Sequence, residues 1–198
     1  TLTGCGPKYE KFSEMLLTQQ YFNTVITVIS YQKSQEDFDE MMDYIDSEFN
    51  RLNRLYDIYY DYPGVNNIKT INDNAGIAPV KVDKDIIDML KFAKEWHDKS
   101  GGRMNIALGS VLKVWHDARE EYDYYGTASL PDIQLLKEKA EHTDINNMII
   151  DEENSTVFLT DSEMRLDVGA VAKGYATEFG KECIWLEDLY IQEAYRSC

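Results

Sequence analysis

The chain has 198 residues, of which 43% are hydrophobic and 28% charged, a composition typical of a globular protein with one sizeable core. Aspartate and glutamate (36) outnumber lysine and arginine (20), which gives a formal net charge of −16. This charge repels phosphate backbones and anionic lipid headgroups, so we expect no nucleic-acid binding and no electrostatic docking on a membrane. No stretch approaches the ~18 consecutive apolar residues of a transmembrane helix.

The first five residues, ending at Cys5, resemble the lipobox of a bacterial lipoprotein, in which a leucine and two small residues precede a cysteine that becomes lipidated. A chance match is the alternative. A lipid on Cys5 would anchor the protein to the outer face of a bacterial cell membrane. Residues 6–18 are polar with few β-branched residues, so we predict a tether and a first segment that spans 1–18.

The next elements alternate between strand and helix patterns. Residues 21–30 are β-branched and apolar, which predicts a buried strand. A capping-box pattern at 34–37 precedes apolar residues spaced by three and four up to Leu55, which predicts a long helix. A second helix is predicted from Asp83 to His97, ending at the glycine pair 101–102.

Strand patterns dominate the second half of the chain. After a short helix that opens near Pro131, residues 147–150 and 156–160 flank a polar turn and predict a hairpin. Residues 164–168 are predicted as a third strand of that sheet. The fold class is therefore α+β, with the 21–30 strand in one mostly antiparallel sheet with these strands and the two long helices packed on one face.

Two glycine-rich stretches do not look like ordinary packing segments. In residues 101–109 a glycine pair precedes a short apolar strand that ends in Leu108 and Gly109, which lets backbone amides approach a ligand. In residues 166–176 a strand ends at Asp167 and a helix follows, an arrangement that suits a phosphate or pyrophosphate. The spacing matches neither the dinucleotide-binding motif nor the P-loop, and a plain loop is an open alternative.

The remaining chemistry-bearing residues are sparse. The three histidines, His97, His116 and His142, are never paired at helical spacing, so a histidine zinc site has little support. Three cysteines near the chain ends make neither a disulfide framework nor a CxxC metal site.

Four segments, taken together and in order, resemble the ApbE family of bacterial FAD:protein FMN transferases. They are residues 21–24, 67–76, 103–115 and, most specifically, 166–176. The resemblance covers about residues 19–180, which we predict to form an ApbE-like flavin transferase domain.

The resemblance implies a set of ligand-binding residues. Those implied to contact FAD are Phe22, Tyr59, Ala107, Leu108, Gly109, Asp167 and Lys173. The backbone carbonyl of Ala170 is implied to bind Mg²⁺, which prefers oxygen ligands. Tyr62 aligns nearly as well as Tyr59, and Asp167 has an alternative role as a helix N-cap.

The resemblance also implies a reaction and partners. A threonine hydroxyl of a target protein attacks the FMN phosphorus of FAD, Mg²⁺ neutralises the pyrophosphate, and AMP leaves. FAD is thus a substrate and not a redox cofactor. The implied targets are electron-transfer subunits of membrane reductases, beside which a lipid anchor would place the protein.

Residues 181–198 have no counterpart in the family that we recognise. We therefore expect the chain to lack the C-terminal part that supplies the remaining Mg²⁺ ligands and a catalytic carboxylate, so no catalytic residue is assigned. We expect very slow FMN transfer or none. The alternatives are an FAD-binding or FAD-hydrolysing lipoprotein and an inactive folded remnant.

Overall fold

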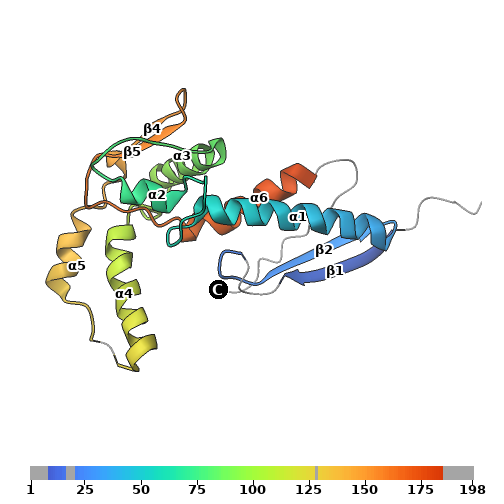
Figure 1. The fold of residues 1–198 in the computed structure, drawn as a ribbon, viewed down its shortest axis with the longest axis horizontal. Coiled ribbons are helices and arrows are strands. Elements are labelled where there is room, and N and C mark those ends of the chain that lie inside the picture. The colour runs from blue at the N-terminus through green and yellow to red at the C-terminus, as the bar shows by residue number, and fades with distance from the viewer. Residues whose placement is uncertain (1–8, 17–20, 128, 185–198) are drawn as a thin grey trace, which may run out of the picture. The chain divides into compact units, whose positions relative to one another are not determined.

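The computed structural model describes residues 9–16, 21–127 and 129–184, which form two compact units (Figure 1). Unit 1 comprises Thr1–Asn53 and Lys173–Cys198, and unit 2 comprises the continuous segment Arg54–Ala172. The predictions for Cys5 and for residues 185–198 lie outside the described residues. The two units are described separately below.

Unit 1 is built on an antiparallel hairpin of β1 (Glu10–Leu16) and β2 (Ile26–Gln32), with Glu10 opposite Gln32. The long helix α1 (Gln35–Tyr56) follows and lies along the hairpin (Figure 1). The Phe12 ring of β1 stacks on Phe38 of α1 at a centroid distance of 5.4 Å, which ties strand to helix. The predicted long helix is thus confirmed almost to the residue.

The tether predicted for residues 6–18 is wrong for residues 10–16, which form β1. The segment has few apolar residues, but Phe12 and Leu16 turn inward, and its backbone satisfies one edge of β2. The 21–30 strand begins late, at Ile26, because Phe22 and Asn23 both have a φ of 52° and form a turn. Pairing partners that lie 10 to 22 residues away cannot be recognised from a local sequence pattern.

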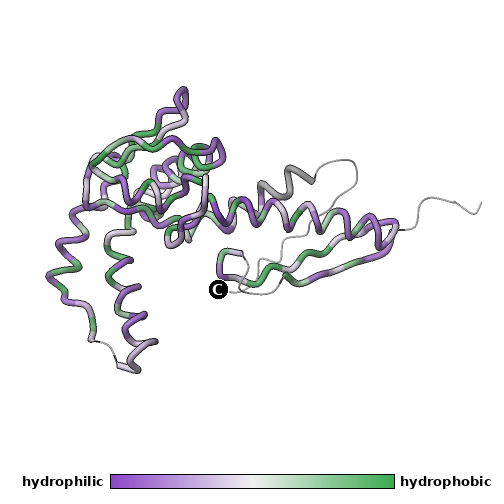
Figure 2. The backbone as a smooth tube through the Cα atoms, viewed as in Figure 1, coloured by the Kyte–Doolittle hydropathy of each residue, from purple (hydrophilic) through white to green (hydrophobic). Residues whose placement is uncertain are grey.

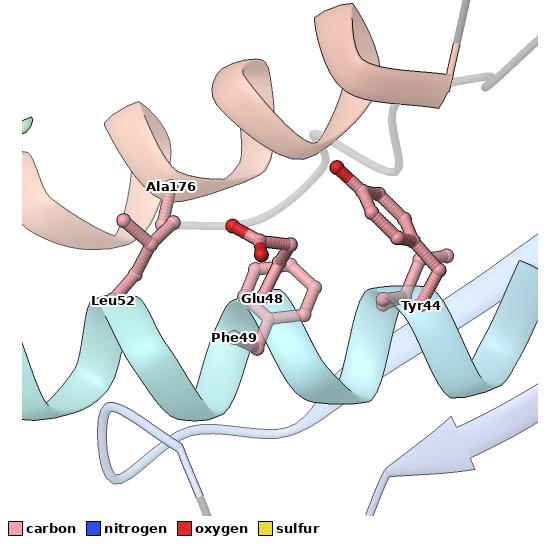
Figure 3. Close-up of a pocket in the computed structure, with 6 residues that line it drawn as sticks. Tyr44, Glu48, Phe49, Leu52 and Ala176 are labelled. Atoms are coloured by element: carbon pink, nitrogen blue, oxygen red, sulfur yellow. The ribbon is translucent and has the colours of Figure 1, made fainter. Parts of the chain in front are cut away.

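The last helix, α6 (Gly169–Ile184), begins in unit 2 and continues into unit 1. Within unit 1, its residue Ala176 lies against Leu52 of α1 (Figure 3). A small depression there is lined by Tyr44, Ile45, Glu48, Phe49, Leu52 and Ala176. None of the predicted ligand-binding residues lines it, so it is not the candidate site.

Unit 2 contains a second sheet and most of the remaining helices. Its elements, before the start of α6, are α2 (Ile68–Asp73), β3 (Val80–Lys81), α3 (Lys84–Lys99), α4 (Gly109–Tyr125), α5 (Ile133–Ala140), the 3₁₀ helix η1 (Ile145–Asn147), β4 (Met148–Asp151) and β5 (Thr156–Leu159). The strand order is β3–β5–β4, and both pairings are antiparallel. The predicted hairpin is therefore confirmed as β4 and β5.

Helix α3 shows why its limits could be predicted locally. The carboxylate of Asp83 accepts a hydrogen bond from the Asp85 N–H at 2.9 Å and caps the first turn. Ile86, Leu90 and Ala93 are completely buried on one face. The helix ends at Ser100, and Gly101 follows with a φ of 64°, a left-handed conformation that glycine adopts without strain.

The α+β class is confirmed, but the single predicted sheet is wrong. β2 pairs with β1 in unit 1, while both edges of β5 are taken by β3 and β4 in unit 2. Residues 164–168 therefore form no strand of that sheet and make one isolated parallel bridge, between Arg165 and Leu108. Hydrophilic and hydrophobic residues alternate along α1 and α4 (Figure 2). No described helix is both long and apolar enough to cross a membrane.

Candidate functional site

The turn that leads into α6 is held by a buried asparagine of α2. The Asn72 Nδ2 group donates to the Leu166 carbonyl at 3.0 Å, and the Leu166 N–H donates to Asn72 Oδ1 at 2.7 Å. The next N–H, that of Asp167, donates to the Ile106 carbonyl at 2.7 Å. Three hydrogen bonds thus fix the backbone, while the Asp167 side chain is only half-buried.

The Asp167 carboxylate lies at the start of α6. Its Oδ1 accepts a hydrogen bond from the Gly169 N–H at 2.9 Å, and the Val168 carbonyl accepts from Val171 and Ala172 at 2.9 and 2.8 Å. The carboxylate therefore does bind a free N–H of the first helical turn, as the helix-cap alternative requires. Within the described residues this is its one hydrogen bond, which leaves acceptor capacity for a ligand.

The loop that precedes α4 runs beside this turn. Asn105 shapes the loop, since its Oδ1 accepts from the Ala107 N–H at 2.9 Å and its Nδ2 donates to the Thr143 carbonyl at 2.8 Å. Ala107 is buried, Leu108 is exposed and pairs with Arg165, and α4 begins at Gly109.

The strand predicted to end at Leu108 and Gly109 is wrong, because these residues form a turn and the first residue of a helix. A Cβ on Gly109 would lie 2.5 Å from the Arg165 carbonyl oxygen. The close approach that this glycine allows is therefore to the protein's own backbone. It brings the loop at Ala107 and Leu108 against the Asp167 turn.

Tyr59 brings an aromatic ring into the same region of unit 2. Its ring lies 4.8 Å from the His116 ring of α4, tilted by 36°. Partial burial, followed by the charge of the Asp167 carboxylate, raises the pKa of the Tyr59 hydroxyl. The hydroxyl is thus neutral at physiological pH and able to donate a hydrogen bond.

Tyr62, the alternative to Tyr59, is engaged elsewhere. Its hydroxyl donates to Asp57 Oδ2 at 2.7 Å, and the Arg54 guanidinium lies 5.6 Å from its ring centroid. Burial, together with the hydrogen bond to Asp57, raises the pKa of Tyr62 to about 12. The Asp167 charge acts on the pKa of Tyr59, whereas the Tyr62 hydroxyl is bound to Asp57, so Tyr59 stays the choice for the aromatic residue of the site.

The predicted FAD-binding residues divide between the two units. Tyr59, Asp167 and the 107–109 loop belong to unit 2, whereas Phe22 and Lys173 belong to unit 1. The Phe22 N–H donates to Asn53 Oδ1 at 2.8 Å, and its ring contacts Phe49 edge-on at 6.3 Å. Lys173 is exposed on α6. FAD binding by these seven residues stays a prediction, with the unit 2 members as its best-defined part.

The implied Mg²⁺ ligand, Ala170, is the second residue of α6 and is exposed. In an α-helix this carbonyl accepts from the N–H four residues ahead, which leaves one lone pair for a cation. Among the described residues no three His, Cys, Asp or Glu side chains gather into a metal site. Such a donor set fits Mg²⁺ that arrives with phosphate oxygens and water, not a cation held by protein ligands alone.

His116 and Glu120 of α4 are not among the residues predicted for the site. His116 Nε2 lies 3.2 Å from Glu120 Oε1 one turn further along the helix. The pair has the four-residue spacing of a helical ion pair, which is a common surface pattern with no functional meaning by itself. Its significance comes from the contact with Tyr59, 57 residues earlier in the chain.

The fold and this turn define the chain as an α+β protein whose candidate site is a loop-to-helix turn. The ApbE family model matches residues 22–188, so the chain belongs to the ApbE family. This confirms the resemblance inferred from the four motifs. The match extends eight residues beyond the boundary predicted at residue 180.

Two curated relatives align with part of the chain. The FAD:protein FMN transferase of Treponema pallidum (strain Nichols) is 34% identical over 116 residues, which are 56% of this chain and 30% of that protein. The FAD:protein FMN transferase of Klebsiella pneumoniae (strain 342) is 28% identical over 130 residues, or 66% of this chain and 39% of the relative. The chain thus matches less than half the length of either relative.

Solved structures share the fold at low sequence identity. The ApbE protein of Thermotoga maritima superimposes with a TM-score of 0.68 at 20% identity. The aligned region covers 88% of this chain and 52% of the Thermotoga maritima chain. The flavin transferase ApbE of Vibrio cholerae gives a TM-score of 0.72 at 16% identity, covering 91% of this chain and 55% of its own. The ApbE fold is thus confirmed.

Proposed function

We propose that this chain is part of a flavin transferase that moves FMN from FAD onto a threonine of a target protein and releases AMP. The threonine oxygen forms a bond to the FMN phosphorus as the pyrophosphate P–O bond breaks, the hydroxyl proton passes to solvent, and AMP departs with the bridging oxygen. The observation that carries the proposal is the Asp167 turn in unit 2, whose backbone is fixed by hydrogen bonds to Asn72 and Ile106. Membership of the ApbE family supports it.

The residues of the turn have complementary roles in this proposal. Asp167 accepts hydrogen bonds from the nucleotide, while the neutral Tyr59 hydroxyl donates one and its ring offers an apolar face. The loop at Ala107 and Leu108 approaches the ligand through its backbone. Lys173 supplies a positive charge for the phosphates. Their contribution to catalysis is positioning and electrostatic stabilisation, as in other phosphoryl transfers.

Mg²⁺ belongs to the proposal as well. The Ala170 carbonyl would hold it together with phosphate oxygens and water. When bound, it supplies neutralisation of the pyrophosphate charge. A substitution at Ala170 cannot remove a backbone carbonyl. Removal of Mg²⁺ by a chelator is therefore the direct test of its role.

The cellular setting is proposed from the N-terminal motif. A lipid on Cys5 would hold the protein on the outer face of a bacterial cell membrane, near electron-transfer subunits of membrane reductases that receive the flavin. Mass spectrometry of the membrane fraction, after expression of a precursor with its signal peptide, tests the anchor. An unmodified Cys5 would contradict it.

The activity is tested with FAD, MgCl₂ and a peptide that carries a threonine flavinylation motif. FMN-modified peptide with an equal amount of AMP supports transfer, whereas free FMN with AMP indicates that water replaces the threonine. FAD binding is measured separately by calorimetry, so that binding without turnover is recognised. Absence of FAD binding would contradict the proposed function.

Asp167→Ala is the variant that addresses the site itself. Loss of a charge-assisted acceptor should weaken FAD binding by roughly tenfold. The matched control is Asp123→Ala, which removes an exposed carboxylate of α4 and should leave the affinity unchanged. An unchanged FAD affinity in Asp167→Ala would contradict a role of Asp167 in FAD binding and leave it only its role as a helix cap.

A further inference from the structure

The rings of Tyr59 and His116 contact each other in unit 2. The two rings lie 4.8 Å apart and come from different elements, the loop after α1 and helix α4. Tyr59 remains 49% exposed. One side of its ring is thus held by the imidazole, while much of the side chain is open to solvent or to a ligand.

Both partners are fixed at their bases. The Asp57 Oδ1 atom accepts hydrogen bonds from the Tyr59 and Tyr60 N–H groups at 2.6 and 3.0 Å, which sets the backbone of the loop. The His116 ring is restrained by Glu120, at 3.2 Å on the same helix. The loop backbone does not fix the orientation of the Tyr59 ring. The His116 imidazole contacts this ring and can therefore fix its orientation.

We propose that His116 is a positioning residue that holds the Tyr59 ring ready for a flat aromatic group of the bound flavin nucleotide. This inference rests on the proposed function. An exposed tyrosine loses side-chain freedom when a ligand orders it, and that loss reduces affinity. A ring already held by an aromatic neighbour avoids part of this cost, and the tilted arrangement at 4.8 Å is favourable for an aromatic pair.

Three variants test the role through FAD affinity. His116→Ala should weaken FAD binding roughly three- to tenfold, and His116→Phe, which keeps a ring but loses the pair with Glu120, should restore most of it. In a Tyr59→Ala background, His116→Ala should have no further effect. His97→Ala is the matched control, because it removes a histidine of α3 that also lies 3.2 Å from a carboxylate, that of Asp98.

A measurement without FAD separates this inference from the proposed function. In protein labelled with ¹³C-tyrosine, the Tyr59 ring signals are identified by their loss in Tyr59→Phe. His116→Ala should move them to the positions of a freely rotating exposed tyrosine, and His116→Phe should return them to a dispersed, ordered position. Thermal unfolding of each variant identifies any loss of the fold.

The outcomes are distinct. Equal FAD affinity in wild type and His116→Ala, or Tyr59 signals that do not change, would overturn the positioning role. If wild-type protein binds no FAD, the proposed function fails and with it the nucleotide role of the pair. The ¹³C spectra still decide in that case whether His116 orders the Tyr59 ring.

Discussion

Tyr21 couples the stability of unit 1 to alkaline pH. Burial and the hydrogen bond from its hydroxyl to Asp46, at 2.7 Å, raise the pKa of Tyr21 to about 12. Below pH ~10, the pKa of a tyrosine in the unfolded chain, the Tyr21 hydroxyl is protonated in both the folded and the unfolded chain. The stabilisation that its hydrogen bond provides is therefore complete there. Above it the unfolded chain loses the proton first, and the free energy of unfolding should fall by up to ~1.4 kcal/mol per pH unit until about pH 12.

Urea unfolding between pH 9 and 11.5 measures this dependence. Tyr21→Phe cannot ionise and should lessen the alkaline loss of stability. Tyr124→Phe, at a position 81% exposed, is the control and should leave the slope as in wild type. Identical slopes for all three proteins would show that Tyr21 ionises alike in the folded and unfolded chains.

Asn72 is the residue on which the candidate site depends for its shape. Asn72→Ala leaves the buried N–H and carbonyl of Leu166 without partners and should lower the free energy of unfolding by about 2–5 kcal/mol. Asn66→Ala is the control, because it removes one exposed hydrogen bond, to the Lys81 carbonyl, and should cost less than ~1 kcal/mol. Equal effects of the two substitutions in urea titrations would contradict this role.

Residues of the site were predictable where the signal is local. Asp167 and Gly169 mark the turn into a helix in the sequence itself, although the strand predicted before it is wrong, and Asp83 and Gly101 mark the ends of α3 in the same way. Asn72 carries no local signal for its role, since its partner Leu166 is 94 residues away. The contact of His116 with Tyr59 likewise exists only in the folded chain.

At the scale of elements, the two ends of α4 carry glycines with different functions. Gly109→Ala would place a Cβ 2.5 Å from the Arg165 carbonyl oxygen, and we expect the backbone shift to cost at least ~2 kcal/mol. Gly126 caps the other end with a φ of 72°, and a Cβ there would meet nothing within 4 Å. Gly126→Ala should therefore cost only about 1 kcal/mol, the strain of a left-handed backbone.

Thermal unfolding of the two alanine variants, analysed side by side, measures this difference. Both substitutions add the same methyl group, so the difference between them reports the close contact at Gly109 against the left-handed backbone at Gly126. A Gly109→Ala variant as stable as Gly126→Ala would show that the loop and the Asp167 turn separate easily.

Elements with a self-contained pattern were predicted and those that depend on a partner were not. The apolar stripes of α1 and α3 and the polar turn between β4 and β5 identify these elements without tertiary information. β1 is too polar to be recognised without β2, and β3 has two residues. Helix α4 was missed because its first turn was interpreted as the end of a strand, and its weakly apolar surface gives no clear stripe.

At the scale of the whole molecule, the deep core lies mainly in unit 2. Of the twelve largest fully buried side chains among the described residues, Leu52 belongs to unit 1 and the other eleven to unit 2. Local opening requires the least free energy where few side chains are buried. Hydrogen exchange followed by mass spectrometry should therefore show faster exchange in β1 and β2 than in β4 and β5, and the reverse order would contradict this division.

The division into units also explains why the prediction of a single sheet was wrong. Strand patterns state which segments are extended but not which ones pair, and the wrong sheet joined β2 to strands that belong to unit 2. Resemblance to the ApbE family identified the class and the fold, although none of its motifs contains β1.

The order of the segments has a consequence for a polypeptide that emerges from its N-terminal side, whether from a ribosome or through a membrane. Unit 2 is one continuous stretch, Arg54–Ala172, so it can complete its core as soon as that stretch has emerged. The first segment of unit 1 precedes this stretch, yet its second segment follows only after these residues, a delay of roughly 6–24 s at the usual rate of translation. The β1–β2 hairpin therefore emerges before unit 2, whereas Leu52 can meet Ala176 only after the whole of unit 2 has emerged.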